Sequence, residues 1–306
     1  MIIEREQKGN KYSKPIITEQ HIEFIKEKYN EGLSQVSIAK LMNVSDRMIR
    51  SIMKENNIGI RSDREQALKY TCNENFFENI DSEEKAYWLG FMYADGFIQN
   101  KRKHSGYKVG ITLSVVDKDH LEKFKKSIDS NCKINTYEQN SGFGGDYSRL
   151  LISSNKMAED LIKNGCLLNK TEKIVFPNEN ILPKELLRHF IRGYIDGDGS
   201  VNYSYLINSK NGLRDKFESK IGVVGTKEFL EGLLEAIELS HLKIGKRHKD
   251  REVNNYQVNI GGNVKVDKML DWIYKDSTIY LDRKYKKYLE IKSKYKRYLV
   301  ELASNS

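Results

Sequence analysis

Hydrophobic residues occupy every second position from Tyr107 to Val115 in the segment at residues 107–116, "YKVGITLSVV". Successive side chains of a β-strand point to opposite faces of its sheet, so this segment is predicted to be a half-buried strand with a polar, basic outer face. The residues predicted for the buried face are Val109, Ile111, Leu113 and Val115. The residues predicted for the outer face are Lys108, Thr112 and Ser114.

The elements around this strand occur in an order that the chain repeats. The first copy opens with a helix that begins at a pattern like a capping box, Asp81 and Glu84, and runs through Ala94. A strand pair, the helix "KDHLEKFKKSI", two strands and the helix "NKMAEDLIKNG" follow. The second copy has the helix "ELLRHFIRGYID", the strand "ESKIGVVG", the helix "TKEFLEGLLEAI", two strands and the helix "VDKMLDWIY". This order predicts an α+β fold made of two pseudo-symmetric αββαββα repeats.

Both opening helices contain small residues where stronger helix formers would be expected. They end in the segments "WLGFMYADG" and "IRGYIDGDG". Gly90 and Ala94 in the first segment, like Gly193 and Gly197 in the second, lie four residues apart on one helix face. Each helix therefore has a flat stripe that another backbone can approach closely, and we expect the two helices to pack stripe to stripe.

The two segments carry aspartates at equivalent positions, Asp95 and Asp198. Stripe-to-stripe packing would place both at one end of the helix pair, where two carboxylates and two helix C-termini repel each other. A divalent cation relieves this repulsion, and oxygen ligands suit Mg²⁺, which completes its coordination with water and phosphate groups. Such a metal supports an in-line displacement at phosphorus with water as the nucleophile.

The N-terminal part of the chain has a different pattern, typical of two short helices joined by a tight turn. Asn43 is suited to the left-handed conformation that ends the first helix, and Ser45 is suited to cap the second. The pattern resembles a helix-turn-helix, in which the second helix enters the DNA major groove. Arg47 and Arg50 would lie on the outer face of that helix, although a charged helix face is also common in proteins that bind no DNA.

These patterns divide the chain into four segments. They are the helix-turn-helix domain at residues 1–62, a linker at 63–80, the first repeat at 81–180, and the second repeat with a basic C-terminal helix at 181–306. Arg61 lies where the chain enters the linker and is a candidate phosphate contact.

Composition favours a soluble protein with a polyanionic partner. Lysine and arginine total 52 of the 306 residues against 43 acidic residues, which gives a net charge of +9. The three cysteines, Cys72, Cys132 and Cys166, lack the paired spacing of zinc sites and of disulfide frameworks. No stretch approaches the roughly 20 apolar residues of a membrane span, and the first residues contain no apolar signal core. We expect an intracellular protein, cytoplasmic if its source is bacterial or phage.

The two nine-residue segments, residues 88–96 and 191–199, resemble the signature motif of the LAGLIDADG homing endonucleases in their monomeric two-repeat form. The likeness extends over roughly residues 83–298, with the helix-turn-helix ahead of it. It implies a saddle of antiparallel strands over the DNA major groove and an intron-encoded monomer with internal pseudo-twofold symmetry. It also implies cleavage of both strands of double-stranded DNA, dependent on Mg²⁺ or Mn²⁺, that leaves 3′ overhangs.

The resemblance assigns metal-binding and basic residues to each repeat. Asp95 and Asp198 match the acidic metal ligands, and the backbone carbonyls of Ala94 and Gly197 match secondary ligands. The basic residues that the family places late in each repeat, near the scissile phosphates, correspond to Lys170 and Lys284. They would polarise water or stabilise the developing charge on phosphate.

A further polar position differs between the repeats. Asp117 matches a water-organising residue of the family, whereas its counterpart in the second repeat is Gly225 or Thr226, because the alignment slips by one residue. The two active sites are therefore expected to be unequal.

Base contacts are expected from the outer faces of the sheets, and phosphate contacts are expected to make binding strongly dependent on salt. The candidate DNA-binding residues are Ser45, Arg47, Arg50, Arg61, Lys108, Thr112, Ser114, Lys220, Gln257 and Asn259.

Three other features have structural interpretations. Asp196 is expected to cap or hydrogen-bond at the helix junction, and His189 is expected to be packed or on the surface. The tail at residues 280–299, rich in lysine and tyrosine, is equally compatible with a phosphate contact and with a tyrosine-lined helix packed on the last sheet.

Two other functions fit the same fold. A non-catalytic transcriptional regulator would combine the fold with a helix-turn-helix, but such proteins tend to lose the acidic residues, and both are present here. An RNA maturase that assists its host intron is the second alternative. An intein is disfavoured because no splicing block precedes the first repeat.

Overall fold

The computed structural model describes residues 16–59, 70–99, 106–138, 145–168, 173–207, 214–247 and 253–304, with side chains omitted at 206–207 and 214–216. The chain divides into two compact units, Met1–Lys69 and Tyr70–Ser306. The boundary predicted after residue 62 lies outside the described residues. None of the described helices combines the length and apolar character that a membrane crossing requires.

The described part of the N-terminal unit, residues 16–59, contains three helices, α1 (Glu19–Asn30), α2 (Gln35–Met42) and α3 (Asp46–Glu55). Asn43 has a φ of 55° and ends α2 in the left-handed conformation. The Ser45 hydroxyl accepts a hydrogen bond of 3.3 Å from the Met48 amide and caps α3. The predicted left-handed residue at Asn43 and the predicted cap at Ser45 are both confirmed. Asparagine favours the left-handed conformation and serine favours the cap position.

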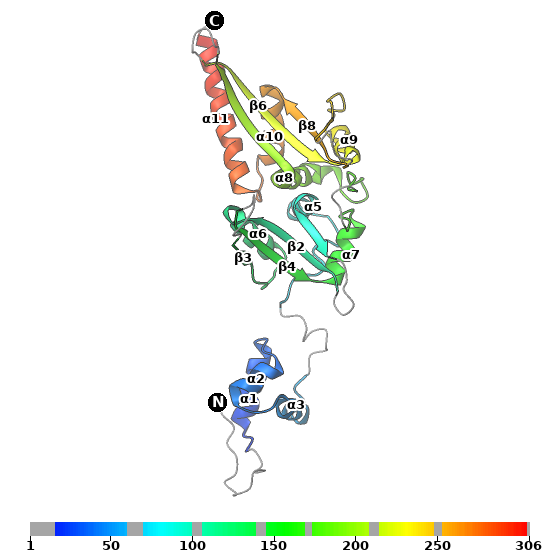
Figure 1. Ribbon diagram of the computed structural model, residues 1–306, viewed down its shortest axis with the longest axis vertical. Helices are drawn as coiled ribbons and strands as arrows, with labels where there is room; N and C mark the ends of the chain where they lie inside the picture. Colours follow the sequence, from blue (N-terminus) through cyan, green and yellow to red (C-terminus); the bar gives the residue numbers. More distant parts are fainter. Residues whose placement is uncertain are drawn as a thin grey trace. The chain divides into compact units, whose positions relative to one another are not determined.

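The second unit contains the two repeats, and the structure confirms the predicted order of elements (Figure 1). The first repeat consists of α5 (Glu83–Ala94), β1 (Gly96–Gln99), β2 (Lys108–Ser114), η1 (Val115–Asp117), α6 (Lys118–Ser127), β3 (Asn135–Tyr137), β4 (Tyr147–Ser153) and α7 (Asn155–Lys163). The second consists of η3 (Lys184–Leu186), α8 (Leu187–Asp198), β5 (Gly199–Ile207), β6 (Arg214–Gly225), α9 (Lys227–Ala236), β7 (Gly245–Lys246), β8 (Tyr256–Gly261) and α10 (Asn263–Tyr274), followed by α11 (Asp282–Ser304).

Each repeat forms one four-stranded antiparallel sheet. The strand orders are β1-β2-β4-β3 and β5-β6-β8-β7, which are the same topology in both copies. Apolar residues on one face of each sheet join a single core with α5, α8 and the other repeat helices. The opposite face of each sheet is left to the surface.

Two expectations about the first repeat are corrected. The cap of α5 is Ser82, whose hydroxyl accepts from the Lys85 amide, whereas Asp81 forms an ion pair with the Lys85 side chain. Val115 does not share the buried face of β2, because the strand ends at Ser114 and turns into η1, which leaves Val115 36% exposed. Val109, Ile111 and Leu113 are buried as predicted.

The C-terminal tail is a helix packed on the second sheet, α11. Tyr295 and Tyr298 of this helix contact the ring of Phe217 in β6, and Lys287 lies over the ring of Tyr203 in β5. Of the two interpretations of the tail, the tyrosine-lined packed helix is confirmed.

Candidate functional site

The opening helices of the two repeats, α5 and α8, pack through their glycine stripes. A Cβ atom added at Gly90 would lie 2.0 Å from the carbonyl oxygen of Phe190, and one added at Gly193 would lie 2.0 Å from that of Tyr87. No side chain fits at either position, so the two backbones are in direct contact. The predicted stripe-to-stripe packing is confirmed.

The same packing brings the carboxyl ends of the two helices together. A Cβ atom at Gly197 would lie 2.3 Å from the Cβ of Ala94 and 3.3 Å from Oδ2 of Asp95. Asp95 ends α5 and is partly buried, and Asp198 is the last residue of α8 and is exposed. The carboxylate of the first repeat therefore lies against the final turn of the second repeat's helix.

Tyr194 lies close enough to both carboxylates to respond to their charges. Burial, followed by the charges of Asp198 and Asp95, raises the pKa of Tyr194 well above its usual value of 10. Its hydroxyl donates a 2.8 Å hydrogen bond to the carbonyl of Val224 in β6. Tyr194 was not among the predicted site residues. Its place in the second motif, between two small residues on the helix, is the sequence signal that could have identified it.

A hollow of about 220 Å³ opens beside Asp198. Ala94, Tyr194 and Arg247 are among the residues that border it, together with Asn255, whose buried Oδ1 has no hydrogen-bond partner among the described residues. This places a guanidinium and an amide at the edge of the acidic junction. Arg247 and Asn255 were not predicted, because nothing in their local sequence pattern links them to the motif helices.

Lys284 of α11 holds the end of α8. Its ammonium group donates to the carbonyls of Ile195, Asp196, Gly197 and Gly199, at 2.6, 2.7, 3.1 and 2.7 Å. Burial lowers the pKa of Lys284 to about 8. The ammonium neutralises carbonyls left unpaired at the helix C-terminus, so Lys284 positions this turn. Its predicted role toward water or phosphate stays a prediction.

Asp196, next to Gly197, is fully buried and satisfied by the protein. Its carboxylate accepts from the hydroxyls of Tyr87 and Tyr274 and from the amide of Leu281. Burial raises its pKa despite these bonds. The prediction that Asp196 forms hydrogen bonds at the junction is confirmed.

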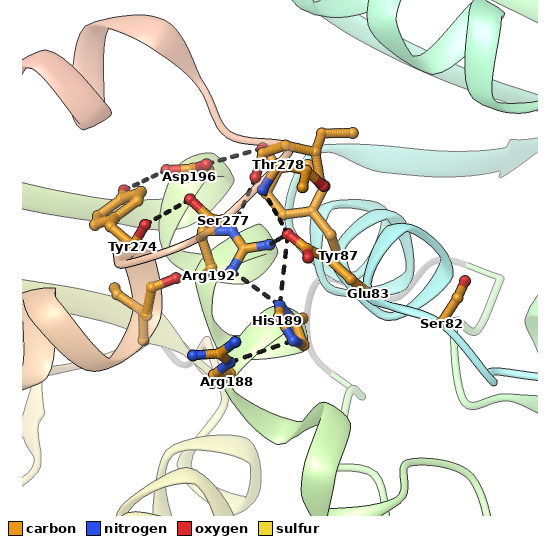
Figure 2. A network of polar contacts seen from close by, with 12 residues as sticks. Ser82, Glu83, Tyr87, Arg188, His189, Arg192, Asp196, Tyr274, Ser277 and Thr278 are labelled. Atoms are coloured by element: carbon orange, nitrogen blue, oxygen red, sulfur yellow. Dashed lines mark hydrogen bonds and ion pairs between the residues drawn. The ribbon is translucent and has the colours of Figure 1, made fainter.

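Arg192 extends the same buried network across the two repeats (Figure 2). It donates to the carbonyls of Ile279 and Ile273, forms a 2.7 Å ion pair with Glu83 of α5, and contacts His189. Burial and the positive charge of Arg192 lower the pKa of His189 to about 4. His189 is therefore a packed, neutral histidine, which confirms the structural interpretation.

The polar position after the first sheet strand differs between the repeats. Asp117 precedes α6 and accepts hydrogen bonds of 2.9 and 3.1 Å from the exposed Arg283. Thr226 holds the equivalent position before α9, where it caps the helix and donates to the carbonyl of Ile174. Of the two candidates for this counterpart, the structure favours Thr226.

The predicted base-reading residues lie on the outer faces of the sheets. In the first sheet Thr112 pairs across strands with Arg149 and accepts a hydrogen bond from it. In the second sheet Gln257 donates to Asn259, and Lys220 pairs across strands with Gly261. In the N-terminal unit Arg47 and Arg50 are exposed on α3, and Arg50 donates to Gln35.

Two predicted residues, Lys170 and Arg61, lie outside the described residues. Within the described ranges, no group of three or more His, Cys, Asp or Glu side chains could hold a metal by itself. The oxygen donors that the resemblance assigns to the helix junction, the two carboxylates and the carbonyls of Ala94 and Gly197, are of a type that suits Mg²⁺. The carbonyl of Gly197 has two lone pairs, so its bond to Lys284 leaves one acceptor site. The three cysteines are free.

Comparisons with known proteins give the following likenesses. No protein-family model matches the sequence. The DNA-directed RNA polymerase subunit Rpo1C of Methanocaldococcus jannaschii is 32% identical over 119 residues, which are 38% of this chain; the chain spans only 12% of that subunit.

Solved structures with a similar fold include three DNA complexes. The I-LtrWI LAGLIDADG homing endonuclease bound to target DNA has a TM-score of 0.49 at 15% identity and covers 74% of this chain and 92% of its own. The LAGLIDADG meganuclease I-AabMI bound to uncleaved DNA has a TM-score of 0.49 at 14% identity, with coverages of 70% and 91%. Meganuclease I-SmaMI bound to uncleaveable DNA has a TM-score of 0.48 at 12% identity, with coverages of 74% and 92%.

Proposed function

We propose that this protein, a chain with the two-repeat LAGLIDADG fold, is a site-specific double-stranded DNA endonuclease of homing type. The observation that carries the proposal is the helix junction, where Asp95 contacts the last turn of α8 and Asp198 ends that helix. Two acidic groups beside two helix C-termini favour the binding of a cation.

The chemistry assigned to this junction is hydrolysis of a phosphodiester bond in each DNA strand. Bound Mg²⁺ or Mn²⁺ would supply Lewis acidity at phosphate and an activated water. Asp95 and Asp198 would hold the cation, with the carbonyls of Ala94 and Gly197 as further ligands. Lys284 fixes the carbonyl of Gly197, and Asp117, oriented by Arg283, organises water beside the first repeat.

The same proposal covers the cleavage products, the dependence of binding on salt and the role of the N-terminal unit. The products carry 3′ overhangs, and a single chain cuts both strands because its two repeats supply both halves of the site. The net charge of +9 supports phosphate contacts, so affinity falls steeply as salt rises. The N-terminal unit extends the DNA footprint through Arg47 and Arg50.

A non-catalytic DNA-binding regulator is the second candidate, and the geometry of the N-terminal unit favours it. The left-handed turn at Asn43, the cap at Ser45 and the exposed arginines of α3 are all features of a DNA-binding helix-turn-helix. Such a unit could deliver the second unit to DNA without any cleavage.

The decisive experiment measures nicking and double-strand cleavage on a randomised duplex library with Mg²⁺ or Mn²⁺. Asp95→Asn and Asp198→Asn are each expected to lower the cleavage rate by a factor of at least about 100, and the double variant to abolish it. Asp276→Asn is the matched control, because it makes the same change of charge at an exposed aspartate outside the junction. Full activity in the double variant would refute the catalytic assignment. Specific binding without cleavage by the wild type would support the regulator.

A further inference from the structure

The outer face of the first sheet carries a cluster of aromatic and apolar side chains that the proposed chemistry does not use. We call it the aromatic face; it consists of Phe97, Tyr137, Tyr147, Arg149 and Leu151. These residues share one face because the register places them opposite one another or opposite Gly110, Thr112 and Ser114. They remain partly or fully exposed, and Tyr137 is 41% exposed. The buried face of the same sheet packs in the core.

Arg149 organises the aromatic face. Its guanidinium lies 5.5–5.9 Å from the ring centres of Phe97, Tyr137 and Tyr147, and its Nε donates a 2.9 Å bond to Thr112. Tyr137 and Tyr147 stack with ring centres 5.1 Å apart. The rings are therefore held in fixed positions on the outer face of the sheet by cation–π contacts and stacking.

The second sheet has a different chemistry at the equivalent positions. Gly222 of the second sheet corresponds to Gly110 of the first. Gly96 pairs with Ile111, the residue after Gly110, and Gly199 pairs in the same way with Val223, the residue after Gly222. A Cβ at Gly110 would touch Phe97 and Leu151, whereas a Cβ at Gly222 would touch Ser200 and Asn259. Ser200 replaces Phe97 and Asn259 replaces Leu151 in the pseudo-symmetric site. The first sheet thus offers apolar groups where the second offers a hydroxyl and an amide.

Each chemistry matches a different group in the DNA major groove. Amide side chains such as those of Gln257 and Asn259 can form bidentate hydrogen bonds with adenine. Phe97 and Leu151 have no polar side-chain atoms, so they can recognise only an apolar group. The apolar group that base pairs present in the major groove is the C5-methyl of thymine.

We infer that the aromatic face makes the first repeat selective for thymine methyl groups in the half-site that it covers. This inference rests on the proposed binding of double-stranded DNA. Phe97 and Leu151 contact the methyl groups directly, and Arg149 positions the rings. The target is then chemically asymmetric, with methyl recognition in one half and hydrogen-bond recognition in the other.

The test removes only the methyl groups. Tight-binding duplexes are selected from a random library in EDTA, so that no divalent cation supports cleavage, and thymidine is then replaced by deoxyuridine in one half-site at a time. Replacement in the half covered by the first repeat is expected to weaken binding about fourfold for each contacted methyl. The same replacement in the other half is expected to leave the dissociation constant unchanged.

A paired exchange of residues identifies the half-sites. Phe97→Ser with Leu151→Asn gives the first sheet the side chains of the second, and should abolish the deoxyuridine effect while shifting the selected sequence in that half alone. Ser200→Phe with Asn259→Leu should create a deoxyuridine effect in the other half. Because deoxyuridine substitution needs no variant, a misfolded variant does not block the test.

The inference is overturned if deoxyuridine has no effect in either half, or an equal effect in both. It is also overturned if duplexes with an unpaired base opposite the first sheet bind more tightly while deoxyuridine is neutral, because the rings would then stack on bases. Failure to select any duplex would refute DNA binding itself, which is a distinguishable result.

Discussion

Gly90 and Gly193 occupy equivalent positions in the two repeats, and each faces the backbone of the other repeat at the same separation. Gly110 and Gly222 are also equivalent, yet one lies between Phe97 and Leu151 and the other between Ser200 and Asn259. The helix contact tolerates no side chain, so both copies keep it. The described side chains discussed on the outer faces of the sheets, Phe97, Leu151, Ser200 and Asn259, are partly or fully exposed, so the two copies can differ there.

The buried polar network is a second difference between the repeats, and it lies inside the core. Arg192 and Asp196 belong to the second motif, and the first motif has Leu89 and Tyr93 at the same places. Tyr93 donates its hydroxyl to the carbonyl of Asn164. The charged groups of this network lie on the side of the α5–α8 contact where the segment before α11 is attached.

The largest expected effect tests the symmetric part of the molecule. Gly90→Ala and Gly193→Ala each force a Cβ into a carbonyl oxygen 2.0 Å away, so α5 and α8 must separate. We expect each to lower the free energy of unfolding by about 4 kcal/mol, with similar values for the two variants. Urea denaturation followed by circular dichroism measures both. Gly261→Ala is the control, because nothing lies within 4 Å of a Cβ at that position. Values differing several-fold would show that the two stripes are not equivalent.

The buried network gives the next effect. Arg192→Leu introduces the residue that the first motif has. It removes one donor from Glu83, which keeps the amide of Thr278, and it removes the Arg192 donors from the carbonyls of Ile273 and Ile279. The loss is expected to be about 3 kcal/mol, since unpaired buried polar groups are costly. Arg188→Leu, at the partly exposed neighbour of His189, should cost less than about 1 kcal/mol. Equal losses in the same denaturation experiment would mean that burial of Arg192 is not the cause.

A third comparison concerns pH. His120 of α6 is buried, and burial lowers its pKa to about 3, whereas the unfolded chain titrates near 6.5. The unfolded state therefore binds a proton that the folded state excludes, and stability falls as pH drops below 6.5. This histidine alone should contribute a loss of about 2.5 kcal/mol between pH 7 and pH 4.5.

The second repeat has Phe229 at the position of His120, since both are the third residue of matching helices, α6 and α9. His120→Phe should therefore reduce the loss of stability in acid by that amount. His189 and Asp196 are present in both the wild type and the variant, so their contributions to the pH dependence of stability cancel in the difference. Unfolding free energies measured at pH 7 and pH 4.5 give the result, and an unchanged acid loss would show that His120 is protonated in the folded state.

Local sequence signals account for most of the fold. Three signals each predicted their part of the fold: the alternation in β2, the paired motifs and the turn at Asn43. Each signal reflects a constraint on the backbone within a few residues. Val115 was misplaced for a related reason. The apolar alternation continues past the point where the backbone turns into η1, and alternation cannot show where a strand ends.

The candidate site was predictable only in part. Asp95 and Asp198 could be paired because glycine spacing implies close contact of their helices. The rest of the site depends on contacts between residues far apart in sequence. Examples are the hydrogen bond from Lys284 to Ile195 at the end of α8 and the place of Arg247 and Asn255 beside Asp198. Such contacts leave no periodic pattern in the chain. Lys284 was identified through resemblance alone, and its buried hydrogen bonds were not foreseen.

The smallest effect distinguishes the two helix starts. Ser82 caps α5 through its hydroxyl, whereas α8 follows the short helix η3 and has no side-chain cap. Ser82→Ala should cost about 1 kcal/mol in unfolding free energy, because an N-terminal amide loses its acceptor. Asp81→Ala removes only an exposed ion pair with Lys85 and should cost less than about 0.5 kcal/mol. If denaturation shows the larger loss for Asp81→Ala, the start of α5 depends on charge at its first turn, and the capping-box interpretation of Asp81 regains its support.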